Sequence, residues 1–178
     1  MNKIGSSKGK ESFRECGLPP ILGKDPAVLI LGSFPSKLSL KWQQYYANPQ
    51  NQFWRIMSDL LTRGCLHDIP SLTGVLVDHQ IAVWDVIASR SYQQGSMDRD
   101  ITDPICNDIP GFIHDHKTIR YIGTNGGKAW ELFRRSTWSI PLISTMVRER
   151  LPSTSPAFAS CSYEQKLLRW QVLLEYLE

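Results

Sequence analysis

The sequence has little of what marks membrane, secreted or metal-binding proteins. No apolar run approaches the roughly 20 residues that a membrane-spanning helix needs, and the start, MNKIGSSKGKESFRECG, has no apolar signal-peptide core. Four cysteines are present, widely spaced and with no CxxC pair among them: Cys16, Cys65, Cys106 and Cys161. We therefore expect a cytoplasmic protein in a reducing compartment, with no disulfide scaffold and no zinc or iron–sulfur site.

Familiar catalytic and binding signatures are missing as well. The Gly-rich spacing and the Lys-Ser/Thr pair of a phosphate-binding loop do not occur. No Ser/His/Asp or Cys/His arrangement suggests nucleophilic catalysis. The net charge of +3 is mildly basic, and by itself it is too small to identify a nucleic-acid-binding protein.

The bulk composition is that of a globular protein. With 42% hydrophobic and 21% charged residues, the chain can form a core, and 178 residues fit one domain. The Gly-, Ser- and Lys-rich start indicates a mobile tail over residues 1–16. We expect residues 17–178 to form the single domain.

Four short apolar runs predict strands, over residues 27–34, 81–87, 118–123 and 140–146. The runs are almost continuously apolar, which is typical of strands covered on both faces. Helical patterns lie between and after them, over residues 48–64, 126–135 and 162–177, the first with Asn48-Pro49 as its start and Gly64 as its C-cap. This order predicts an α/β three-layer sandwich with a short, mostly parallel four-stranded sheet flanked by helices.

Polar segments stand where the predicted strands end. Ligands of parallel sheets bind beyond the carboxyl ends of the strands, and there the sequence places GSFPS (32–36), TNGG (124–127) and VRERLPSTSPAF (147–158). Trp84-Asp85 comes late in a fourth run. We expect these segments to meet at one rim.

Two side chains near this rim each allow two interpretations. Asp85 interrupts an apolar run, where a carboxylate is costly unless it has a partner; it either pairs with Arg90 or accepts an N–H from a ligand. Asn51 is expected in the first helical turn, either solvated or positioning a water molecule or a phosphate. Asn48 is interpreted as a helix cap.

Six motifs occur in an order that resembles the uracil-DNA glycosylase superfamily, and most of all its hypoxanthine-DNA glycosylase branch. They are LPPILG, LILGSFPS, QQYYANPQNQFWRIM, VWDVI with GSMDRDI, NGGKAWELF and LPSTSPA, and they span the chain from about Gly17 to its end. The resemblance implies hydrolysis of the N-glycosidic bond of deaminated bases in DNA, which leaves an abasic site. It implies no metal and no organic cofactor. Such enzymes flip the target nucleotide into a pocket, and we expect a monomer with DNA as its partner.

The resemblance also assigns roles. Tyr46 matches the position where relatives stack an aromatic ring on the flipped base, and Asn51 is the candidate for orienting water. On physical grounds, and not from the resemblance, Asp85 is the second candidate catalytic residue: it can accept the ring N–H of hypoxanthine or uracil, whereas adenine offers a lone pair there, a mismatch that costs roughly 1–3 kcal/mol. The remaining base-binding candidates are Gly32, Ser33, Phe34 and Asn125, with the backbone N–H groups of the turn placed to stabilise the leaving base.

The loop after the last predicted strand supplies the candidate DNA contacts, because hydroxyls and cations suit phosphate; an ordinary surface loop is the other interpretation. These residues are Arg148, Arg150, Pro152, Ser153, Ser155 and Phe158. In place of the apolar wedge of some relatives stands Ser155, so Phe158 is the candidate to fill the gap left by a flipped base.

Two positions depart from the superfamily. Phe34 stands where mismatch-specific relatives carry a water-orienting Asn or Asp, and Leu151 stands where many relatives carry His or Asn. A non-catalytic nucleic-acid-binding module and a hydrolase of free nucleosides are therefore kept as alternatives. The choice among hypoxanthine, uracil and xanthine stays open, because each presents an N–H beside a carbonyl.

Overall fold

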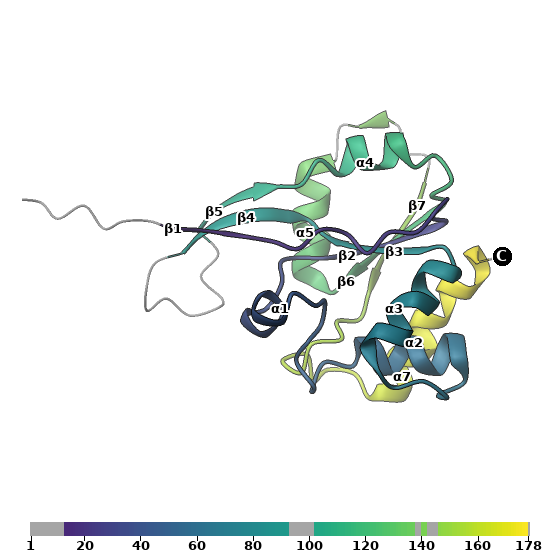
Figure 1. The fold of residues 1–178 in the computed structure, drawn as a ribbon. Coiled ribbons are helices and arrows are strands. Elements are labelled where there is room, and N and C mark those ends of the chain that lie inside the picture. The colour runs from purple at the N-terminus through teal and green to yellow at the C-terminus, as the bar shows by residue number, and fades with distance from the viewer. Residues whose placement is uncertain (1–12, 93–101, 138–139, 142–145, 178) are drawn as a thin grey trace, which may run out of the picture.

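A parallel four-stranded sheet lies at the centre of the protein (Figure 1). In this computed structural model, residues 13–92, 102–137, 140–141 and 146–177 are described. The strands stand in the order β3 (Ile81–Asp85), β2 (Val28–Gly32), β6 (Tyr121–Asn125) and β7 (Val147–Leu151). All three pairings are parallel, so the carboxyl ends of the strands face the same way.

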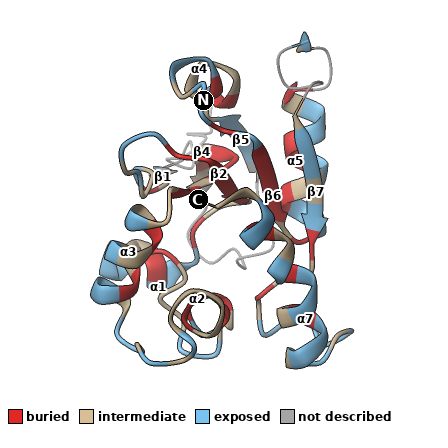
Figure 2. Cartoon of the chain, turned by 90° about the vertical axis from the view of Figure 1, so that its right-hand side faces the viewer, coloured by how far each residue is buried: buried red, intermediate tan, exposed pale blue. Residues whose placement is uncertain are grey.

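Helices cover both faces of this sheet. Alternate residues of a strand point to opposite faces, and the strands accordingly contribute to two apolar clusters. One cluster joins the sheet to α2 (Phe53–Thr62), α3 (Ile69–Asp78), α7 (Tyr163–Trp170) and the 3-10 helix η1 (Gln171–Tyr176). The other joins it to α4 (Ile109–Asp115) and α5 (Gly127–Thr137). Figure 2 shows the buried residues gathered on the strands and the helix faces turned toward them, and the predicted three-layer α/β fold is confirmed.

A second, antiparallel sheet was not predicted. Its strands are β4 (Ile87–Tyr92) at the centre, with β1 (Phe13–Cys16) and β5 (Thr102–Cys106) on either side. β1 pairs with β4 from Phe13 opposite Tyr92 to Cys16 opposite Ser89. The prediction of a tail over residues 1–16 is therefore wrong for residues 13–16, because backbone pairing with a distant strand fixes them; residues 1–12 lie outside the described part.

The fourth predicted strand is also corrected. The strand that pairs with β6 is Val147–Leu151 and not residues 140–146, of which 142–145 lie outside the described residues. Arg148 and Arg150 thus lie inside a strand and not in the loop after it. β7 tolerates these charges because, among the described residues, it is an edge strand with a neighbour on one side only.

The helix predicted to start at Asn48-Pro49 begins at Phe53, with Gln52 as its N-cap. Asn48 caps a tighter turn instead, because its side-chain oxygen accepts the backbone N–H of Gln50. At the other end Arg63, with a positive φ of 55°, is the C-cap, one residue before the predicted Gly64. A short helix, α1 (Lys37–Trp42), follows β2. No helix in the described ranges combines the length and apolarity that crossing a membrane requires.

Trp170 ties the helical layer to the loop after β7. Its side chain is fully buried, and its indole N–H donates to the carbonyl of Pro152 at 3.0 Å. Its ring packs edge-on against the ring of Phe53, with ring centres 5.9 Å apart. We expect Trp170→Phe to lower the free energy of unfolding in urea by about 2 kcal/mol, because it removes buried volume and leaves that carbonyl unpaired. Trp42→Phe is the matched control, since Trp42 is 65% exposed, and its effect should stay within about 0.5 kcal/mol. Equal effects of the two substitutions would contradict this account.

Candidate active site

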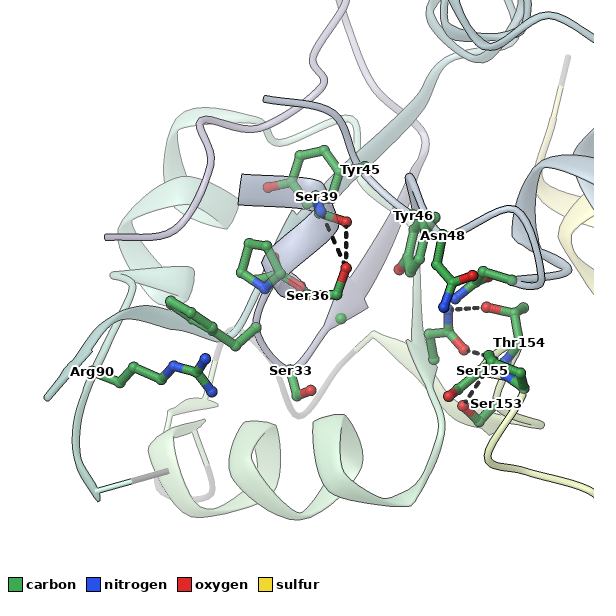
Figure 3. Close-up of a pocket in the computed structure, with 17 residues that line it drawn as sticks. Ser33, Ser36, Ser39, Tyr45, Tyr46, Asn48, Arg90, Ser153, Thr154 and Ser155 are labelled. Atoms are coloured by element: carbon green, nitrogen blue, oxygen red, sulfur yellow. Dashed lines mark hydrogen bonds between the residues drawn. The ribbon is translucent and has the colours of Figure 1, made fainter. Parts of the chain in front are cut away.

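A cavity of about 280 Å³ opens at the carboxyl ends of β2, β3 and β6. The turn 32–36 forms one wall, and residues 153–156 form another. Figure 3 shows Ser33 and Ser36 on one side of this space and Ser153 and Ser155 across from them, with Tyr46 between the two groups. The rule that ligands bind beyond the carboxyl ends of parallel strands thus locates the candidate site.

Nine of the thirteen residues predicted for the site line this one cavity: Gly32, Ser33, Phe34, Tyr46, Asn51, Asp85, Asn125, Ser153 and Ser155. The other four predicted residues are not part of the lining: Arg148, Arg150, Pro152 and Phe158. Eight further residues line the cavity without having been predicted for the site: Pro35, Ser36, Ser39, Tyr45, Asn48, Arg90, Thr154 and Pro156. The pairing of Arg90 with Glu15 could not be predicted from the sequence, because the two residues are 75 positions apart in the chain.

Asp85 ends β3 at the bottom of the cavity. It is 3% exposed, and its Oδ2 atom has no hydrogen-bond partner among the described residues. Burial, which disfavours the charged form, raises the pKa of the carboxyl to about 7. Arg90, the partner considered from the sequence, instead binds Glu15 with two nitrogens at 2.9 and 2.8 Å. That leaves ligand contact as the interpretation of Asp85 that the geometry favours.

Gly32 is required by the position of Asp85. A methyl group on its Cα would lie 2.1 Å from Asp85 Oδ1 and 3.3 Å from the Tyr46 hydroxyl, so no other residue fits without displacing the carboxylate. The carbonyls of Gly32 and Ser33 accept the N–H groups of Val86 and Ile87 at 2.9 and 3.0 Å. These bonds fix the turn, and within the described residues the N–H groups of Ser33 and Phe34 have no acceptor.

Phe34 has no polar group to offer, and its ring is held from outside the turn. The Arg90 guanidinium lies 4.6 Å from the centre of the ring, while Glu15 binds that guanidinium from β1. The antiparallel sheet therefore supports the turn that closes one side of the cavity. A side chain in this environment shapes the cavity without taking part in proton transfer.

Tyr46 adopts a positive φ of 52°, which places its side chain across the cavity. One face of its ring stacks on the buried Phe53, with ring centres 4.1 Å apart at 27°. Its hydroxyl is buried and makes no hydrogen bond within the described chain. Burial and, to a lesser extent, the nearby Asp85 raise the pKa of this hydroxyl above its usual value, while the Asn125 amide acts in the opposite direction. Tyr46 therefore stays protonated and can donate.

Asn51 precedes α2 and is not in its first turn. Its side-chain oxygen accepts the N–H of Phe53 at 3.0 Å, and its own N–H donates to the carbonyl of Asn48 at 2.8 Å. The first bond fixes the orientation of the amide. It leaves one lone pair on the oxygen and the side-chain NH2 group for a ligand or a water molecule.

Asn125 and Thr154 form a clamp across the rim, joined by two hydrogen bonds. The Asn125 amide donates to Thr154 Oγ1 at 2.8 Å and accepts the Thr154 N–H at 2.9 Å. The carbonyl of Thr154 accepts the N–H of Gln52 at 3.0 Å. Asn125 was predicted to bind the base. Its side chain uses one N–H and its oxygen to bond to Thr154, and its second N–H remains for a ligand in the cavity.

The buried Asp85 has a measurable signature in stability. An unfolded Asp loses its proton near pH 3.8, whereas folded Asp85 keeps it to about pH 7. Between these values the folded state binds more protons, so its stability falls as the pH rises. From about pH 5 to about pH 8 the wild type should lose about 2–3 kcal/mol of unfolding free energy relative to Asp85→Asn, as followed by urea unfolding. Asp115→Asn removes an exposed carboxylate and should show the same change of unfolding free energy with pH as the wild type. If Asp85→Asn also showed the wild-type change, the raised pKa of Asp85 would be refuted.

No model of a known protein family matches the chain. Two curated relatives do: a hypoxanthine DNA glycosylase of Methanosarcina acetivorans, 37% identical over 145 residues (79% of this chain and 86% of the relative), and one of Methanosarcina barkeri, 28% identical over 124 residues (67% and 75%). The solution NMR structure of a candidate uracil DNA glycosylase from Methanosarcina acetivorans superimposes with a TM-score of 0.73 at 30% identity, covering 90% of this chain and 96% of that one. The chain therefore belongs to the hypoxanthine DNA glycosylase branch of the uracil-DNA glycosylase superfamily.

Proposed function

We propose that this protein is a DNA glycosylase that hydrolyses the N-glycosidic bond of a deaminated base, hypoxanthine first among them, and leaves an abasic site. The observation that carries the proposal is the cavity at the strand ends, whose floor holds the buried carboxyl of Asp85, with its Oδ2 atom unpaired among the described residues. Such a group suits a flat heterocycle with an N–H on its edge. The hypoxanthine DNA glycosylases to which the chain is similar support the same substrate class.

Each wall of the cavity has a part in the reaction. A water oxygen bonds to C1′ of the sugar while the bond from C1′ to the base nitrogen breaks, and its electron pair leaves with the base. The proton that water loses passes to the departing base or to solvent. Asn51 orients the water through its free lone pair and NH2 group, and the N–H groups of Ser33 and Phe34 stabilise charge that develops on the base. Asp85 accepts the N–H of the base.

The reaction stops at the abasic site. A lyase step needs an amine that forms a Schiff base with the sugar, and among the described residues that line the cavity there is no lysine. The buried Lys166 of α7 is held by other groups, because it donates to Gln52 Oε1 at 2.9 Å and to the carbonyl of Phe158 at 3.0 Å. We therefore propose a monofunctional glycosylase.

DNA contacts follow from the residues around the mouth of the cavity. Ser153 and Ser155 line the cavity. Arg150 lies one residue before the end of β7, with its guanidinium 3.4 Å from the position that a methyl group on Gly127 would take, at the start of α5. Arg148 stands two residues farther from the rim, about 7 Å along the strand. Pro152 and Phe158 support this loop through their carbonyls, which accept from Trp170 and Lys166, and Phe158 is the candidate wedge.

Asn51 provides the first test. In single-turnover assays on a duplex with one deoxyinosine, followed by alkali to cut abasic sites, Asn51→Ala should release base at least about 100-fold more slowly than wild type, because the water loses its orienting group. Binding to the same duplex should survive. Gln50→Ala, an exposed side chain in the same turn, is the matched control and should keep wild-type activity. Wild-type rates in Asn51→Ala would remove Asn51 from the mechanism.

The two strand arginines provide a second test. Arg150→Ala should weaken binding to a duplex regardless of its base sequence and lower the slope of log affinity against log salt by about 1, as expected for one lost phosphate contact. Arg148→Ala, farther from the rim, should change both quantities less. Both quantities are measured by fluorescence anisotropy over a salt series. The reverse order would contradict this assignment and place the phosphate contact farther from the rim, near the start of β7.

A second candidate function is a nucleic-acid-binding module without catalysis. It is favoured by Phe34, whose ring is packed beneath Arg90, and by Leu151, which is fully buried and cannot reach a leaving group. This candidate requires salt-dependent DNA binding with no release of hypoxanthine, uracil or xanthine. Release of any of the three in the assay above decides against it.

A further inference from the structure

Two polar atoms at the floor of the cavity have no partner in the described part of the chain. They are the hydroxyl oxygen of Tyr46 and Oδ2 of Asp85, each nearly inaccessible to water. Leaving a buried donor or acceptor unpaired costs free energy. Both residues line the same cavity, so a bound base is the group that can satisfy them.

The two groups are neighbours. A single methyl group on Gly32 would contact Asp85 Oδ1 at 2.1 Å and the Tyr46 hydroxyl at 3.3 Å. The carboxylate and the hydroxyl therefore both border one methyl-sized position, within a few ångströms of each other, without bonding to each other. A neutral hydroxyl donates and an ionised carboxylate accepts, so the pair presents one donor beside one acceptor.

We propose that Tyr46 and Asp85 together read the edge of the flipped base, with the Tyr46 hydroxyl donating to a carbonyl oxygen and the Asp85 carboxylate accepting the adjacent ring N–H, and that protonation of Asp85 relaxes this selection. The proposal rests on the proposed glycosylase function and names its substrate class: bases with a lactam edge. Hypoxanthine has N1–H beside C6=O. Adenine has a lone pair at N1, which faces the carboxylate without a shared proton. Its NH2 group at C6 forces the Tyr46 hydroxyl to accept, which leaves the hydroxyl proton without an acceptor.

Protonation matters because a neutral carboxyl group carries a donor and an acceptor at once. It can pair with an N–H or with a ring lone pair, and the selection against adenine weakens. Burial raises the pKa of Asp85 to about 7, so this change falls near neutral pH.

Few titratable groups share the described lining with Asp85. From the segment before α2 the titratable neighbours are Tyr45, whose hydroxyl donates to the carbonyl of Leu18, and Tyr46. The titratable neighbour from β4 is Arg90, which is bound to Glu15. β2 and β6 contribute Gly32 and Asn125, which do not titrate. Selection by the pair should therefore follow the proton on Asp85.

The test compares affinities and does not need the chemical step. Duplexes carry one 2′-fluoro-arabino nucleotide, which resists hydrolysis, with either hypoxanthine or adenine as its base. Fluorescence anisotropy gives the ratio of their dissociation constants. In the wild type this ratio should favour hypoxanthine about tenfold more at about pH 8.5 than at about pH 5.5.

Three variants show which side chains cause the pH-dependent selection. Asp85→Asn carries a donor and an acceptor at every pH, so its ratio should be low and independent of pH. Tyr46→Phe keeps the ring on Phe53 and should lower the ratio about tenfold at high pH. Because the lost hydroxyl had no partner, its urea midpoint should equal or exceed that of wild type. Tyr121→Phe removes a buried hydroxyl outside the cavity, bonded to Glu149 at 3.3 Å, and should keep the wild-type ratio.

The outcomes separate the two proposals. A wild-type ratio that does not change with pH, a Tyr46→Phe ratio equal to wild type, or no binding to the hypoxanthine duplex each overturns edge reading by the pair. A lower urea midpoint for Tyr46→Phe would also overturn it, because that result assigns the hydroxyl a structural partner. Should the ratios behave as expected while ordinary deoxyinosine is never released, edge reading stands and the glycosylase function fails.

Discussion

A carboxyl group held out of water at the end of a central strand sets the conditions for the rest of the site. Asp85 stands directly beside Gly32 in the parallel register of β2 and β3, and the space between them is too small for a side chain. This close approach brings the strand-end turn and its free N–H groups next to the carboxylate. It also brings the Tyr46 hydroxyl within reach of the same point, so the cavity floor is polar while its surroundings are apolar core.

The walls of the cavity are held rigid by hydrogen bonds between distant segments. The Asn125–Thr154 clamp joins the end of β6 to the loop after β7, and the Thr154 carbonyl joins that loop to the start of α2. Lys166 adds a second link from α7 to Gln52. On the opposite side, Glu15 and Arg90 hold the ring of Phe34. A cavity fixed in this way is preorganised for a base, which lowers the cost of ordering the site when DNA binds.

The sequence predicted the buried strands of the parallel sheet well and the exposed strands poorly. Continuous apolar runs found the strands that are buried on both faces, β2, β3 and β6, because burial on both faces leaves no room for polar alternation. β7 was missed because an edge strand carries Val147, Arg148, Glu149 and Arg150, which read as a surface segment. The antiparallel sheet was missed because its strands pair across distances of tens of residues, and short polar strands such as β1 have no local signal.

What the sequence determined by itself was the fold class, the family and the identity of most cavity residues, because these follow from local pattern and from motifs in a fixed order. The tertiary structure decided the partners. Only the folded chain shows that Arg90 binds Glu15, that Asn125 bonds to Thr154, and that the Tyr46 hydroxyl lies near the Asp85 carboxylate. Each of these depends on distances between residues far apart in the chain, and a linear sequence carries no such distances.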